Sequence, residues 1–75
     1  MSMPLVRLDD LYPDGLAIQV NWDAWDVGMS IFVPCTGLNR AGIQARAIAK
    51  RKGYTLEVRS GIEDGFLGVR IWRIT

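Results

Sequence analysis

The chain has 75 residues, of which 49% are hydrophobic, so it is long enough for one domain with one core. One cysteine and no histidine exclude an internal disulfide and a zinc site built from cysteine and histidine, and remove the commonest acid–base catalyst. No run approaches the roughly 18 apolar residues of a membrane span, and no signal peptide is visible, so we expect a cytoplasmic protein without membrane contact.

The net charge of +1 conceals a division between the two halves of the chain. Residues 1–35 carry one basic and five acidic side chains, whereas residues 36–75 carry eight basic and three acidic ones. This asymmetry favours a polyanionic partner. The alternative is that the acidic half folds against the basic half and neutralises it through surface ion pairs.

The first half of the chain predicts an irregular segment followed by two strands. Residues 1–15 are expected to be irregular and to end in a turn at residues 12–15, Tyr-Pro-Asp-Gly. Apolar residues alternate with polar or small ones over residues 16–22, which indicates a half-buried strand. A second strand is expected over residues 29–33, ended by Pro34.

A helix is the clearest predicted element. Thr36 or Asn39 is expected to cap its N-terminus, and Gly53 occupies the position of a C-terminal cap. Basic residues 50–52 lie in the last turn, where cations meet the negative end of the helix dipole. The apolar stripe is mostly alanine, so the helix can approach a sheet closely.

Two further strands are expected over residues 54–60 and 66–74, joined by a hairpin connection at residues 61–65. The order β-β-α-β-β predicts an α+β fold in which one helix packs on one face of a small antiparallel sheet of about four strands. We expect residues 1–75 to form a single domain. A homodimer would add the buried area that so short a chain lacks.

Two motifs resemble phosphate-binding or catalytic loops, and both fail. Residues 37–42 have the outer glycine spacing of a P-loop, but Ile43 and Gln44 replace the lysine and hydroxyl residue that hold phosphate and magnesium. Cys35 and Arg40 are separated by four residues rather than the five of thiol phosphatases. We therefore predict no enzyme activity, no cofactor and no metal, with Cys35 as a buried hydrophobe; a reactive thiol is the alternative.

What remains is a set of basic side chains on the helix and the C-terminal hairpin, with one tryptophan among them. Six of the eight basic residues after position 36 are arginine, whose planar fork suits phosphates and base edges. A helix or a two-stranded ribbon fits the DNA major groove. The predicted nucleic-acid-binding residues are Arg40, Arg46, Lys50, Arg51, Arg59, Arg70, Trp72 and Arg73. The alternative is a solvated basic face with Trp72 in the core.

Three segments resemble a group of small, uncharacterised bacteriophage proteins. They are residues 25–34, Trp-Asp-Val-Gly-Met-Ser-Ile-Phe-Val-Pro, residues 54–59, Tyr-Thr-Leu-Glu-Val-Arg, and the ending at residues 68–74, Gly-Val-Arg-Ile-Trp-Arg-Ile. The resemblance covers residues 25–75. It implies a viral accessory protein that acts in the host cytoplasm on DNA or on host machinery.

Two functions stay open at this point. The first is a nucleic-acid-binding accessory or regulatory protein, in which helix and hairpin arginines contact DNA phosphates and Trp72 stacks. The second is a protein-binding inhibitor or modulator of a host enzyme such as a polymerase, gyrase or nuclease effector. Its contact surface would be Trp22, Trp25 and Trp72, because tryptophan and arginine are enriched at binding hot spots.

Overall fold

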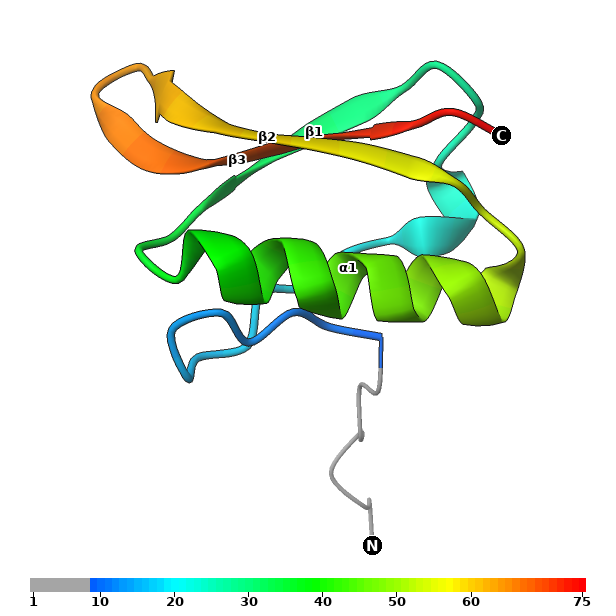
Figure 1. The fold of residues 1–75 in the computed structure, drawn as a ribbon, viewed down its shortest axis with the longest axis horizontal. Coiled ribbons are helices and arrows are strands. Elements are labelled where there is room, and N and C mark those ends of the chain that lie inside the picture. Colours follow the sequence, from blue (N-terminus) through cyan, green and yellow to red (C-terminus); the bar gives the residue numbers. More distant parts are fainter. Residues whose placement is uncertain (1–8) are drawn as a thin grey trace, which may run out of the picture.

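The computed structural model of this chain describes residues 9–75, so residues 1–8 of the expected irregular segment lie outside it. One 3₁₀ helix, one α-helix and three strands follow in chain order (Figure 1). They are η1 (Trp22–Ala24), β1 (Ser30–Pro34), α1 (Leu38–Lys52), β2 (Leu56–Glu63) and β3 (Phe66–Arg73). The predicted α+β class is confirmed.

The three strands form one antiparallel sheet in the order β1-β3-β2, so β3 is central and β1 and β2 are the edges. Helix α1 lies along one face of this sheet, and the segment that begins at residue 9 runs along the far side of the helix (Figure 1). No described element covers the opposite face of the sheet. We call these the inner and the outer sheet face.

The strand predicted over residues 16–22 is not confirmed, and the sheet has three strands rather than about four. Ile18 instead forms an isolated bridge with Leu11, with N···O distances of 3.0 and 2.7 Å, and Trp22 begins η1. Ile18 and Val20 pack against the core, but Leu16 is 79% exposed. The alternating pattern therefore identifies the burial of Ile18, Val20 and Trp22, but neither that of Leu16 nor a place in the sheet.

The ends of α1 are fixed differently from each other. Its C-terminal cap is Gly53, as predicted, with φ of 78°. At the N-terminus neither Thr36 nor Asn39 caps the helix, because Gly37 holds the cap position without a side-chain bond. The carboxylate of Asp14 accepts hydrogen bonds there from the N–H of Thr36 at 2.9 Å and of Gly37 at 2.7 Å.

The hairpin between β2 and β3 is tighter than predicted. Asp64 and Gly65 alone form the connection, with φ of 51° and 81°, and Glu63 pairs directly with Phe66. Two successive residues with positive φ make a type I′ turn, which Asp-Gly favours because its twist matches that of the strands. Strand β2 therefore extends to Glu63 instead of ending at residue 60.

The core lies between the inner sheet face and α1, and the N-terminal segment closes it. Trp22 and Trp25 are 2% and 3% exposed and pack edge to face with their ring centroids 5.1 Å apart. Their burial removes them from the contact surface expected for a protein partner. Cys35 is buried as predicted, and this burial raises the pKa of its thiol, which disfavours the reactive thiolate. The remaining buried hydrophobic residues are Leu11, Val33, Ala41, Ala45, Ile48, Ala49, Val69 and Ile71.

Candidate binding surfaces

The sheet separates the eight predicted nucleic-acid-binding residues into three groups. Four lie on α1, which covers the inner face: Arg40, Arg46, Lys50 and Arg51. Since Val58, Val69 and Ile71 pack toward the core, strand alternation places Arg59, Arg70 and Trp72 on the outer face. Arg73 shares the inner face with Ile71. The predicted residues therefore do not form one continuous basic surface.

Arg70 is held at the centre of the outer face by a bidentate ion pair with Glu63. Its Nε donates to Oε2 of Glu63 at 2.7 Å, and its Nη1 donates to the hydroxyl of Ser30 at 2.8 Å. The hydrogen bonds from Arg70 lower the pKa of the Glu63 carboxyl group. The guanidinium carbon also lies 5.8 Å from the ring centroid of Phe32.

Phe32 lies beside this ion pair and was missed by sequence reasoning. A β-carbon on Gly68 would collide with the Phe32 ring and with the carbonyl of Val33, so the ring lies over a position that only glycine leaves free. Alternation alone could have found it, because Ile31 and Val33 both pack toward the core and leave Phe32 on the opposite face.

Arg59 and Trp72 form the second cationic and aromatic pair of the outer face. The guanidinium carbon of Arg59 lies 5.9 Å from the indole centroid, and Trp72 is partly buried. Arg59 also approaches Glu57 at 3.4 Å, but both side chains are largely exposed, so this ion pair is weak. With Phe66 63% exposed near the hairpin turn, the outer face carries three aromatic rings, two arginines and two glutamates.

The basic residues of α1 are partly neutralised by the acidic N-terminal half. Asp9 forms ion pairs with Arg51 at 3.7 Å and with Lys52 at 3.2 Å. Arg40 acts on Asp14 through its charge, and it adds to the hydrogen bonds from Thr36 and Gly37 that chiefly lower the pKa of that carboxyl group. These contacts bear out the alternative that the two halves neutralise each other, although only in part.

Arg46 and Lys50 have no ion-pair partner among residues 9–75; Arg40 has none either, but its charge acts on Asp14. Arg46 and Lys50 lie one turn apart on α1, and both side chains are exposed. The unneutralised positive charge of the helix is therefore concentrated on the side that carries these two residues.

Arg73 has a structural role. Its guanidinium carbon stacks 3.6 Å from the ring centroid of Tyr54, and its side chain donates hydrogen bonds to the carbonyls of Trp25 and Thr75. These partners hold the guanidinium group of Arg73 on the inner side of the sheet, away from Arg59, Arg70 and Trp72.

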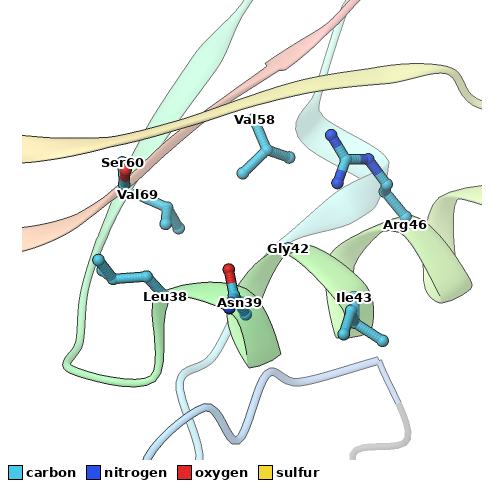
Figure 2. Close-up of a pocket in the computed structure, with 8 residues that line it drawn as sticks. All are labelled: Leu38, Asn39, Gly42, Ile43, Arg46, Val58, Ser60 and Val69. Atoms are coloured by element: carbon cyan, nitrogen blue, oxygen red, sulfur yellow. The ribbon is translucent and has the colours of Figure 1, made fainter.

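A groove of about 390 Å³ lies between the first half of α1 and strand β2 (Figure 2). Arg46 extends from the helix toward β2, and Val58 points from the strand into the groove. The lining residues are Leu38, Asn39, Gly42, Ile43, Arg46, Val58, Ser60 and Val69.

Two further findings concern the described part of the chain. Residues 9–75 bring together no group of three or more acidic or cysteine side chains that could hold a metal ion. Within the same range, α1 is too short and too polar to cross a membrane.

Comparison with known proteins adds no relative from which a function could be transferred. No family model, no curated protein and no solved structure matches this chain.

Proposed function

We propose that this protein binds single-stranded nucleic acid on its outer sheet face, as a small accessory or regulatory protein of bacteriophage type. The proposal rests on one observation: Phe32 and Trp72 lie on an uncovered sheet surface, each with an arginine about 6 Å from its ring. Sheet-borne aromatic rings flanked by cations are the usual platform for unpaired bases.

We expect the two rings to reach adjacent bases because of the register of β1 and β3. Ser30 pairs with Trp72 and Phe32 pairs with Arg70, so the two aromatic residues are diagonal neighbours on adjacent strands. Stacking of a base on an aromatic side chain is worth about 1–3 kcal/mol. Arg59 and Arg70 lie beside the rings, where they can meet the phosphates that link the stacked bases.

The outer face favours single strands over a duplex. The bases of a duplex stack on one another and expose only their edges in the grooves, so Phe32 and Trp72 can stack fully only on bases that are unpaired. The helix and the hairpin were expected to contact DNA together, but α1 covers the inner face of the sheet, whereas Arg59, Arg70 and Trp72 of the hairpin lie on the outer face. We therefore assign the contact to the outer face alone.

The test is a fluorescence anisotropy titration of a labelled oligothymidylate of about 12 nucleotides, compared with a duplex of equal length. Phe32→Leu and Trp72→Leu keep an apolar side chain but remove the stacking surface, and each should weaken binding about fivefold or more. Unchanged affinity in both variants would show that the outer face is not the site.

The matched control is Arg46→Ala combined with Lys50→Ala, which removes two cations of α1 that have no ion pair among residues 9–75. We expect this variant to retain its affinity and its salt dependence, because the helix lies behind the sheet. A weaker affinity with a shallower dependence on salt would instead place the phosphate contacts on the helix.

A protein partner is the second candidate function, as expected for a modulator of a host enzyme. The observation in its favour is the unpaired edge of strand β2 beside the groove, in the part of the chain that the structure describes. With Trp22 and Trp25 in the core, that edge is the better contact surface.

A further inference from the structure

Within residues 9–75, strand β2 leaves a row of backbone groups without partners at the edge of the sheet. Ile74 donates its N–H to the carbonyl of Thr55, and hydrogen-bonding direction alternates along an antiparallel pair. The odd-numbered residues of β2 therefore bond to β3, and the even-numbered ones point their N–H and C=O groups outward. These outward residues are Leu56, Val58, Ser60 and Ile62.

The two edges of the sheet differ in their protection. β1 has five residues and ends at Pro34, which cannot donate a hydrogen bond. β2 has eight residues in uninterrupted register, without a proline, a lysine or a bulge. Prolines, lysines and bulges are devices by which proteins normally prevent a further strand from pairing at an exposed edge. The edge of β2 is thus open to strand addition.

The groove lies directly under this edge. Val58 and Ser60 line it from the sheet, and Leu38 and Ile43 line it from α1 (Figure 2). In a strand added beside β2, every second side chain would point to the inner face and enter the groove. Ile43 is 67% exposed, so an apolar side chain of the added strand would cover apolar surface that water now contacts.

The charge beside the groove selects among possible occupants. Arg46 lines the groove and Lys50 follows it one turn later, and neither has an ion pair within the described residues. An acidic group on the added strand would meet both cations, and arginine accepts a carboxylate in a bidentate geometry.

A second copy of the chain fits this charge poorly. Antiparallel pairing of two β2 strands about Val58 would place Glu57 of each copy opposite Arg59 of the other, which is favourable. The same two-fold arrangement would put both helices on one face of the joined sheet, with Arg46 and Lys50 of both copies along one seam. Four unpaired cations would then face each other across it.

We propose that an extended acidic segment of a partner protein adds to β2 as a fourth strand. Its backbone pairs with the outward groups of Val58 and Ser60, its alternate apolar side chains fill the groove, and a carboxylate binds Arg46. This interaction goes beyond nucleic-acid binding, because it uses the edge and the inner side of the sheet and leaves the outer face free.

The test is a selection, from a display library of random peptides of about ten residues, of those that bind the intact protein. Peptides with alternating β-branched or aromatic residues and at least one Asp or Glu should be enriched. A labelled synthetic copy of the most enriched peptide is then titrated against variants. Enrichment of basic peptides, or of none, would overturn the proposal.

Ser60→Pro removes one outward N–H and should weaken peptide binding about tenfold or more, while the pairing with β3 persists because Ser60 does not donate to it. Circular dichroism and thermal unfolding verify that the variant is folded. Ser60→Glu is the second variant: the side chain is exposed, and its charge repels the acidic peptide. Equal binding by wild type and both variants would contradict strand addition.

Arg46→Ala should also weaken binding of the acidic peptide, whereas Arg40→Ala removes the same charge away from the groove and should not. Sedimentation of the protein without peptide tests the rival occupant. A concentration-dependent dimer that is lost in Ser60→Pro would assign the edge to a second copy and overturn the proposal.

Discussion

Asp14 lies in the turn after Pro13, yet its hydrogen bonds are made with the residues that precede α1. Its carboxylate accepts the N–H groups of Thr36 and Gly37 and the hydroxyl of Thr36 at 2.9 Å. One exposed side chain therefore ties the N-terminal segment to the start of the helix, where backbone N–H groups otherwise lack partners. Negative charge at this end also suits the helix dipole.

We predict that Asp14→Asn lowers the free energy of unfolding at neutral pH, because an amide accepts these hydrogen bonds more weakly than a carboxylate does. The pKa of Asp14 is lower in the folded protein than its ordinary value of 3.8. Its contribution is therefore complete above that value and disappears as the pH falls through the lower, folded pKa. Thermal unfolding from neutral to acidic pH measures this: the difference between wild type and variant should shrink in acid. Asp23→Asn, at an exposed position on η1, is the control, and a constant difference would contradict the prediction.

Glu63 is a second single residue with a testable effect. Its carboxylate binds the guanidinium group of Arg70, which a phosphate would need. Glu63→Gln should release Arg70 and strengthen binding of the oligothymidylate, with a steeper dependence on salt. Glu57→Gln frees the already exposed Arg59 and should have a smaller effect. If Glu63→Gln weakens binding or leaves it unchanged, Arg70 is not a phosphate contact.

At the scale of an element, the two edges of strand β2 differ in the hydrogen bonding of their backbone amides. The amides of Glu57 and Arg59 face β3, whereas those of Val58 and Ser60 face solvent. Amide hydrogen exchange followed by NMR should therefore alternate along β2, with fast exchange at Val58 and Ser60. Protection of these two amides in the free protein would mean that something already covers the edge, and protection that appears only with the selected peptide would support strand addition.

Some elements of this fold can be predicted from the sequence, and others cannot. The helix and the hairpin were predictable because local chemistry marks them: Gly53 ends α1, and Asp64-Gly65 forms the turn between alternating strands. Residues 16–22 alternate equally well but pair only through the bridge at Ile18. Alternation identifies the buried side of a segment, and the choice between sheet pairing and packing on a helix depends on distant residues.

The candidate site was less predictable than the fold for a similar reason. Side-chain charge is visible in the sequence, but the partner that neutralises it is not. Nothing local indicates that Asp9 meets Lys52 or that Glu63 clamps Arg70. Arg46 and Lys50 cannot be distinguished from Arg51 until the folded N-terminal segment shows which cations have partners.

The molecule as a whole is layered, with the N-terminal segment, α1 and the sheet in succession (Figure 1). The two proposed surfaces are consequently separate: the outer face for nucleic acid, and the β2 edge with its groove for an acidic peptide. We predict that both ligands bind at the same time. Titration of labelled peptide should give the same affinity with and without saturating oligothymidylate. Mutual displacement would mean that both ligands use one surface.

The perpendicular pair of Trp22 and Trp25 gives the layered molecule an optical marker. Two indoles this close couple their excited states, so the native protein should show an exciton couplet in its far-ultraviolet circular dichroism, superimposed on the backbone signal. Trp72, on the other side of the sheet, takes no part in it. Disappearance of the couplet would report detachment of the N-terminal layer even while α1 and the hairpin remain folded.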